Sequence, residues 1–401
     1  MPGWPRCIRW ESCVTGSVCS VSSKEQGESE DIEGPAFLLS EGKKEAIMEN
    51  TRAIERYLQA VPKAELHIHL EGSIQPATLL TLARRNGVTL PVSTLAEMRA
   101  WFRFRDFPHF VEIYFALSSC LKTADDYELI AYECGAEMAR QNVRYAEVTF
   151  SPSTHRYGRG LAHDVYFHGL NAGRQRARRD FGVEMRWVFD IVRDIADESE
   201  RLRRAEYTTA VAIEAMHDGV VALGLGGYER GYPPEQFASC FEKALSAGLH
   251  SAPHAGETEG PASVWGALQT LGAQRIGHGV RSIEDAELVS YLAANGVPLE
   301  VCPLSNICLA IYPSLAEHPL PRLHGRGIPI TVNSDDPSLF NATLQQNIQS
   351  LYETFSLSLD TIDEILLNGV RQSFLAQAKK EQLEIAFRAE MIRLRQEYGL
   401  V

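Results

Sequence analysis

Residues 64–72 read AELHIHLEG, a short apolar run that ends in two histidines and an acidic turn. Seven further apolar runs follow along the chain, and segments with apolar residues at helical spacing separate them. They are VRYAEVTFS (143–151), VEMRWVFDIV (183–192), GVVALGLGG (219–227), GLHSAPHAGE (248–257), AQRIGHG (273–279), VPLEVCP (297–303) and IPITVNSDD (328–336). Strands that alternate with helices indicate right-handed crossovers and a parallel sheet, so eight such units predict an α/β TIM (β/α)8 barrel. An open doubly wound sheet is the alternative.

Two regions fall outside the regular alternation. Residues 74–141 hold more helical pattern than one crossover needs, and FRFRDFPHFVEIYFALSSCL (102–121) within them is predicted to be an extra helix near the barrel mouth. Residues 1–47 are rich in Ser, Gly and Glu, which predicts a disordered tail and leaves 48–401 as the barrel domain. A helical pattern follows Met48 directly, so Met48 could also be the true start of translation.

Composition favours a soluble enzyme with a small-molecule substrate. The 401 residues are 45% hydrophobic and 23% charged, which is ordinary for a globular protein with a large core. A formal net charge of -13 opposes nucleic-acid binding, and no apolar run approaches the ~20 residues of a membrane span. Cysteines beyond the tail are too scattered for a disulfide framework, so we expect a cytoplasmic protein. The sequence leaves the oligomeric state open.

Candidate metal ligands stand at the ends of the predicted strands, where barrel enzymes place their chemistry. His67 and His69 lie two residues apart, so strand alternation points both side chains to one face. His254 and Glu257 end the fifth run, and His278 ends the sixth. Any one of these could be an ordinary polar residue in a loop. Their shared position after strands indicates one common site.

The last run adds the adjacent carboxylates Asp335 and Asp336. Two neighbouring carboxylates repel each other unless a cation or a proton compensates. One of them could instead cap the helix that follows Pro337. Three histidines and one carboxylate make a nitrogen and oxygen site that suits zinc, with a position left open for water.

The series HIHLEG, GLGGYE, HAGE, IGHG, CPLSN and VNSDDP, in this order, resembles the motif series of the adenosine deaminase family. The resemblance covers the chain from about Pro62 onward. It implies that one zinc ion per chain is bound by His67, His69, His254 and Asp335. The implied activity is hydrolysis of the exocyclic amine of an adenine-like ring.

The resemblance also implies the catalytic and substrate contacts. Glu257 would carry a proton to the ring nitrogen beside the amine-bearing carbon, and His278 would orient the attacking water and help to deprotonate it. Asp335 would act in catalysis as well as in metal binding. Substrate contacts are expected from four residues, His69, Glu71, Gly227 and Asp336. Of these, Asp336 would meet the imidazole edge of the purine and the Gly227 backbone its pyrimidine edge.

Glu71 is a departure from many adenosine deaminases, which have Asp at this position near the 5′ side of the sugar. The expected reaction is conversion of adenosine to inosine and ammonia. A deaminase of 6-aminodeoxyfutalosine, a 5′-extended adenine nucleoside of menaquinone biosynthesis, is the close alternative, because GLGGYERGYPP and HAGETEGPASVWGAL resemble that group. Adenine deaminase is the third candidate.

Two other classes share the barrel. Dinuclear amidohydrolases bridge two metals with a lysine of the fourth strand, but this chain has no lysine between Lys122 and Lys243. A barrel retained only for binding would have lost a ligand or the proton donor, and none is missing. The remaining histidines, His318 among them, are predicted to have no chemical role, although His155 could reach the barrel mouth.

Overall fold

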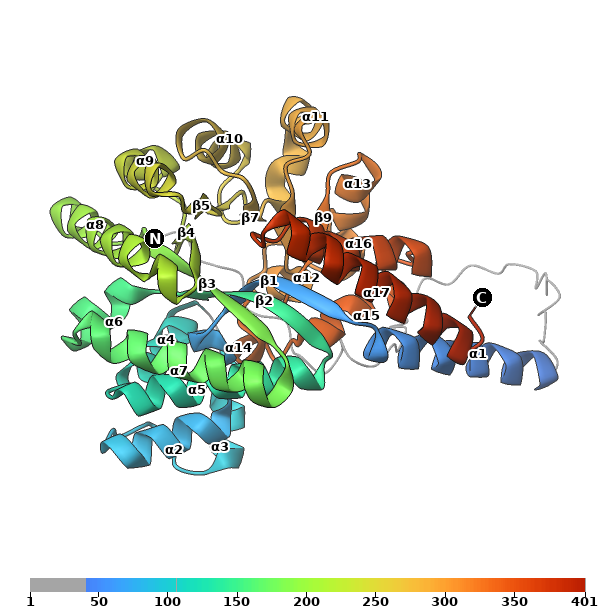
Figure 1. Cartoon of the computed structure of the whole chain (residues 1–401), viewed down its shortest axis with the longest axis horizontal. Helices are drawn as coiled ribbons and strands as arrows, with labels where there is room; N and C mark the ends of the chain where they lie inside the picture. The colour runs from blue at the N-terminus through green and yellow to red at the C-terminus, as the bar shows by residue number, and fades with distance from the viewer. Residues whose placement is uncertain (1–40, 106, 401) are drawn as a thin grey trace, which may run out of the picture.

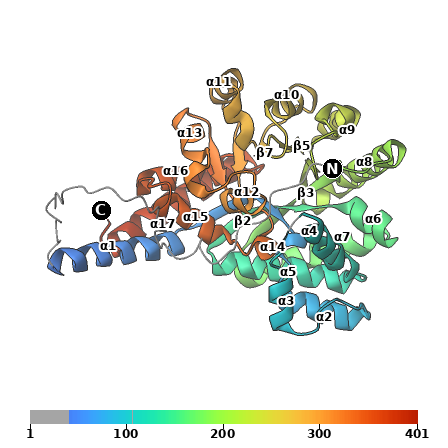
Figure 2. The same cartoon turned by 180° about the vertical axis from the view of Figure 1, so that it is seen from behind.

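The computed structural model describes residues 41–105 and 107–400, and Figures 1 and 2 show it from two opposite sides. Most of the predicted tail, residues 1–40, lies outside the described residues, so the tail stays a prediction. Helix α1 (Glu41–Ala60) is the helix expected ahead of the first strand, and it begins before Met48.

Parallel strands form the centre of the fold and match the eight predicted runs, with the fifth run split into two strands. One sheet has the order β1 (Lys63–His69), β2 (Val143–Phe150), β3 (Glu184–Val192), β4 (Val220–Gly226), β5 (His250–Ser251). The second has the order β6 (His254–Ala255), β7 (Ile276–His278), β8 (Leu299–Val301), β9 (Ile330–Val332).

The split between β5 and β6 falls at Ala252 and Pro253, because proline has no N–H to give to a sheet ladder. Backbone hydrogen bonds continue past the split. The N–H of Ala252 donates to the carbonyl of Leu223 at 3.1 Å, and the N–H of Gly277 donates to the carbonyl of Pro253 at 2.9 Å. The two sheets are therefore continuous on this side.

The other side closes through β1. The N–H of His69 donates to the carbonyl of Asp335 at 2.8 Å, and the N–H of Asp335 donates to the carbonyl of His67 at 3.1 Å. These bonds join β1 to the segment after β9 and complete a ring. The fold is the predicted TIM (β/α)8 barrel, and the open doubly wound alternative is wrong.

Helices surround the ring (Figure 1). The α-helices after α1 are α2 (Pro76–Asn86), α3 (Leu95–Trp101), α4 (Phe107–Ser119), α5 (Ala124–Arg140), α6 (Pro152–Arg159), α7 (His163–Phe181), α8 (Glu198–Glu214), α9 (Ala238–Ala247), α10 (Pro261–Thr270), α11 (Ala286–Asn295), α12 (Pro303–Cys308), α13 (Leu320–Gly325), α14 (Pro337–Phe340), α15 (Leu344–Glu353), α16 (Leu359–Arg371) and α17 (Gln377–Glu397). Short 3-10 helices are η2 (Glu71–Ser73), η3 (Ala215–Asp218), η4 (Pro234–Phe237), η5 (Val280–Glu284) and η6 (Leu315–Glu317).

The helices cover the barrel unevenly. In both views α8, α9, α10, α11 and α13 fan around one half of it, and α1 and α17 lie side by side at one end of the molecule (Figures 1 and 2). Tyr57 of α1 donates to Asp363 of α16 at 2.6 Å, and Arg395 of α17 contacts the same carboxylate at 2.7 Å. Within the described residues no helix combines the length and apolar character of a membrane span.

Strand β1 shows how the sequence period places polar groups inside the barrel. Leu66 and Ile68 belong to the hydrophobic core, and α16 packs on this strand. The alternate residues His67 and His69 therefore share the opposite face, as predicted.

A buried ion network fills the barrel beneath these histidines. Arg275, directly ahead of β7, contacts Glu147 of β2 at 2.6 Å and Glu300 of β8 at 2.5 Å. It also donates to the carbonyl of Gln372 at 2.9 Å and lies 3.7 Å from the ring centre of Phe374. The network thus joins the barrel interior to the segment that follows α16.

Candidate active site

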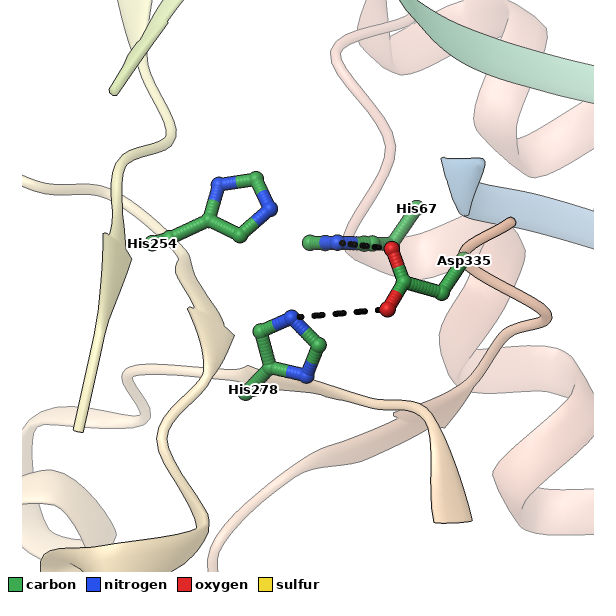
Figure 3. Close-up of side chains that lie close together, drawn as sticks. All are labelled: His67, His254, His278 and Asp335. Atoms are coloured by element: carbon green, nitrogen blue, oxygen red, sulfur yellow. Dashed lines mark ion pairs between the residues drawn. The ribbon is translucent and has the colours of Figure 1, made fainter. Parts of the chain in front are cut away.

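Side chains from separate strands converge at the carboxyl-terminal mouth of the barrel (Figure 3). His67 lies in β1, His254 begins β6, His278 ends β7 and Asp335 follows β9. One ligand atom from each of these four residues lies within 4.8 Å of the others. His69 joins the same centre, because its Nε2 is 3.3 Å from both Asp335 Oδ1 and His254 Nε2. The barrel brings together every metal ligand named from the sequence.

The donor atoms of this centre fit a zinc ion. His67 Nδ1 lies 2.9 Å from Glu300 Oε2 and donates its proton there, so loss of the other ring proton would leave a lone pair on Nε2 for a metal. That Nε2 is buried and has no hydrogen-bond partner among the described residues. His69 and His254 each turn an Nε2 toward the same point. Three imidazole nitrogens and the Asp335 carboxylate are the ligand types of a mononuclear zinc site.

Charge around the centre also favours a cation. Burial alone would lower the pKa of His67, but the carboxylates of Asp335 and Glu300 outweigh burial and raise this pKa to about 10, so in the absence of another cation the ring carries a positive charge. Burial lowers the pKa of His69, and burial together with the charge of His67 holds the pKa of His254 well below its ordinary value. The carboxylates thus hold a positive charge beside the neutral imidazoles of His69 and His254, and a metal cation would take the place of one proton of His67.

The adjacent carboxyl groups favour opposite protonation states. Burial would raise the pKa of Asp335, but the nearby His67 ring and the charges of the neighbouring histidines hold it well below the ordinary value. Burial and the negative charge of Asp335 raise the pKa of Asp336 well above the ordinary value. Asp335 is therefore a carboxylate that can bind metal. Asp336 is a carboxylic acid that can donate a hydrogen bond to a ligand.

Glu257 and His278 lie beside each other, with 3.5 Å between His278 Nδ1 and Glu257 Oε1. Burial and the charge of Asp335 raise the pKa of Glu257 well above its ordinary value, which favours the acid form. Burial lowers the pKa of His278 to about 4, so this ring is neutral. His278 and Asp335 both have left-handed backbones, with φ of 58° and 66°. Such strain in residues other than glycine concentrates at functional sites.

A cavity of about 410 Å³ contains the centre and reaches residues of α4, α6 and α14. Its apolar walls include Phe110, Tyr114 and Phe115 of α4, as well as Phe340, whose ring stacks on Phe110 with 5.8 Å between centres. Helix α4 is the extra helix expected near the mouth, and this prediction is confirmed. The volume lies in the range of pockets that enclose drug-sized ligands.

Residues 62–387 match the sequence profile of the family described as adenosine deaminase. The chain belongs to the adenosine deaminase family. It is 38% identical over 336 residues to the aminodeoxyfutalosine deaminase of Streptomyces coelicolor, and the alignment covers 83% of this chain and 85% of that protein.

Solved structures agree with this membership. The adenine deaminase from Arthrobacter aurescens has a TM-score of 0.77 at 33% identity and covers 84% of this chain and 100% of its own. An amidohydrolase from Burkholderia ambifaria with bound zinc has a TM-score of 0.78 at 28% identity and covers 87% and 95%. This adenosine deaminase family member is therefore a hydrolytic deaminase for adenine-like substrates.

The residues expected to contact the substrate lie in two places. Gly227 and Asp336 line the cavity, as does His69. Glu71 is fully buried, and its Oε1 lies 2.9 Å from Nε2 of His155, which is also fully buried. The expected contact between Glu71 and the sugar therefore stays a prediction.

Glu229, the last residue of the GLGGYE motif, holds the loop of Glu257 and is not among the site residues predicted from the sequence. Its carboxylate accepts hydrogen bonds from the backbone N–H groups of Gly256, Glu257 and Thr258 at 2.8 to 2.9 Å. Burial would raise its pKa, but Arg193 and these donors hold it below the ordinary value. Glu229 thus fixes the loop that carries Glu257.

Two further residues shape the centre. Ser305 of the CPLSN motif donates to Asp335 Oδ2 at 2.6 Å and holds that oxygen. Gly72 of η2 lies so close to Asp336 that a Cβ at Gly72 would be 1.8 Å from Asp336 Oδ1. The motif strings contained both residues, but only the folded backbone shows these contacts.

Proposed function

We propose that this chain binds one zinc ion through His67, His69, His254 and Asp335, and that it hydrolyses the 6-amino group of an adenine-containing small molecule. The supporting observation is the convergence of imidazole rings and a carboxylate at one cavity, beside Glu257 and Asp336, whose pKa burial raises well above the ordinary value. Zinc, when bound at such a site, supplies a Lewis acid that polarises water for attack at neutral pH.

The carboxyl groups account for the rest of the reaction. Attack on the amine-bearing carbon breaks the ring conjugation, so the neighbouring ring nitrogen must accept electron density. Glu257 in its acid form protonates that nitrogen. Asp336 donates a hydrogen bond to the imidazole edge of the purine, and the backbone of Gly227 contacts its pyrimidine edge. His278 orients the attacking water. Of the two protons of this water, one restores the acid form of Glu257 and the other leaves with the amine as ammonia, which completes the reaction.

Within this class we favour 6-aminodeoxyfutalosine over adenosine, the substrate that the breadth of the family puts first. The support is the match to an aminodeoxyfutalosine deaminase over 336 residues and a cavity of about 410 Å³, a volume in the range of pockets for drug-sized ligands. Adenine is a close second candidate, because adenine deaminases match at 37% and 38% identity, so identity alone does not separate the two substrates. The ring chemistry is the same for all three.

The test follows ammonia release from each of the three substrates by zinc-loaded protein. We expect fastest turnover of 6-aminodeoxyfutalosine, and we expect Glu257→Gln to lower kcat by roughly 10²- to 10⁴-fold, the usual contribution of a general acid. Glu259→Gln is the matched control, because Glu259 lies on the same loop but pairs with the exposed Arg230.

Each outcome has a clear meaning. If the zinc-loaded protein releases no ammonia from any of the three substrates, the substrate assignment is wrong. Normal turnover by Glu257→Gln would remove the proton-donor role. Metal analysis is independent of both: one zinc per chain supports the mononuclear site, whereas two would indicate the dinuclear class and none an inactive barrel.

A further inference from the structure

His318 lies outside the metal centre but is joined to it by hydrogen bonds. It follows η6, is 3% exposed, and accepts the backbone N–H of Leu320 at its Nδ1 at 3.2 Å. An imidazole nitrogen that accepts a hydrogen bond carries no proton. In a neutral ring the single proton is then on Nε2, and burial lowers the pKa of His318 to about 3, which keeps the ring neutral.

The proton on His318 Nε2 fixes the orientation of the Asn306 amide. The Nε2 atom lies 3.1 Å from Asn306 Oδ1, which accepts the bond. The amide nitrogen of Asn306 must therefore point the other way, toward the active site. Asn306 is fully buried in α12, and the N–H of Ile311 donates to its backbone carbonyl at 2.8 Å, so the residue is held at its backbone as well.

Asn306 Nδ2 has two hydrogens and meets two acceptors. It lies 3.2 Å from Glu257 Oε1 and 3.3 Å from His278 Nδ1. Those two acceptor atoms are only 3.5 Å apart and would repel without donors between them. The two N–H groups of one amide satisfy both atoms, so neither Glu257 Oε1 nor His278 Nδ1 carries a proton.

We propose that His318 and Asn306 are positioning residues that determine which atoms of Glu257 and His278 carry protons, through a directional chain of hydrogen bonds starting at the N–H of Leu320. The proton of Glu257 is then on Oε2, the oxygen left free for a substrate. The proton of His278 is on Nε2, which lies 3.9 Å from Asp335 Oδ2. His278 thus presents a donor to the centre, which suits orientation of a water and not removal of its proton. The catalytic meaning of this chain rests on the proposed deaminase function.

The direct test reads the histidine tautomers by two-bond ¹H–¹⁵N NMR of the full-length, zinc-loaded protein labelled with ¹⁵N-histidine. The His318→Gln variant assigns the His318 signals. We expect both His318 and His278 to carry the proton on Nε2. A proton on Nδ1 of His318 would reverse the chain and overturn the proposal. The measurement needs no substrate, so it stands even if all three proposed substrates fail.

The kinetic test compares two substitutions of His318. His318→Gln keeps an N–H at the position of Nε2, and we expect its kcat to stay within about 3-fold of the parent value. His318→Asn is too short to reach Asn306, and we expect kcat to fall about 10-fold or more with KM nearly unchanged, because a misplaced catalytic group is costly. Equal losses in both variants, or none in either, would contradict the proposal.

Two controls separate positioning from folding. His324 of α13 is a nearby, partly buried histidine, and His324→Asn should leave kcat unchanged. Asn306→Asp keeps the side-chain shape but removes both N–H donors, and we expect kcat to fall at least as far as in His318→Asn. Thermal melting of every variant shows whether the protein is folded. Loss of kcat in proportion to lost folded protein would assign His318 a packing role only.

Discussion

At the scale of single residues, the active site depends on how closely neighbouring residues can pack as much as on their charges. Asp336 lies against Gly72, where any side chain would collide with its carboxyl group. The glycine is thus needed for space, since its own φ is not in the left-handed region. Sequence motifs name the reacting groups but not the neighbours that leave room for them.

This contact predicts the effect of Gly72→Ala. The added methyl group displaces Asp336, and a shift of about 1 Å in a positioning group costs on the order of 10²-fold in rate. We expect kcat/KM for the preferred substrate to fall by about that factor, with bound zinc unchanged. Steady-state kinetics and metal analysis measure the two quantities.

Gly325→Ala is the matched control, because a Cβ at Gly325 meets open space and should leave kcat/KM unaltered. Full activity in Gly72→Ala would mean that Asp336 does not need its present position for catalysis.

At the scale of elements, the sequence predicted the barrel and the converging histidines because both follow from strand periodicity. It did not predict the split of the fifth strand at Pro253, since the apolar pattern continues through the break. The contacts of Glu229 with the loop of Glu257 and of His318 with Asn306 were also not predicted. Each joins residues distant in sequence, and periodicity carries no information about such contacts.

The loop after β6 provides the next prediction. Glu229 is almost fully buried, and Glu229→Gln replaces a charge that accepts several N–H bonds and lies 3.9 Å from Arg193. Breaking a buried charged pair costs about 3–5 kcal/mol, so we expect a loss of this order in the free energy of unfolding and a fall in kcat. Urea unfolding measures the first quantity.

The pH dependence of stability provides a second readout for Glu229. Its pKa in the folded protein lies below the ordinary value, so its stabilisation is present above the unfolded pKa and is lost as pH falls through the folded pKa. We expect Glu229→Gln to remove this acid-side loss. If the variant loses the same folding free energy at low pH as the parent protein, other carboxyl groups cause this loss. Glu259→Gln is again the control.

At the scale of the whole molecule, the proposed ligands join the first strand to segments near the end of the barrel. Zinc that binds only the folded chain stabilises it by mass action, by about 2.7 kcal/mol at a hundredfold excess over Kd. We therefore expect a chelator to lower Tm by at least about 3 °C, as scanning calorimetry would measure. In His254→Ala, Tm should not respond to the chelator. An identical response in that variant would place the metal elsewhere.

The buried network beneath the site has a consequence for biosynthesis. Glu300 holds the ring of His67, and Arg275 holds Glu300 while bonding to the carbonyl of Gln372. A ligand on the first strand thus receives part of its support from residues near the end of the chain. On the ribosome this support forms only after Gln372 has left the exit tunnel. The proposed zinc binding therefore needs a chain synthesised past Gln372, and a translation product that stops before this residue would lack part of the support of His67.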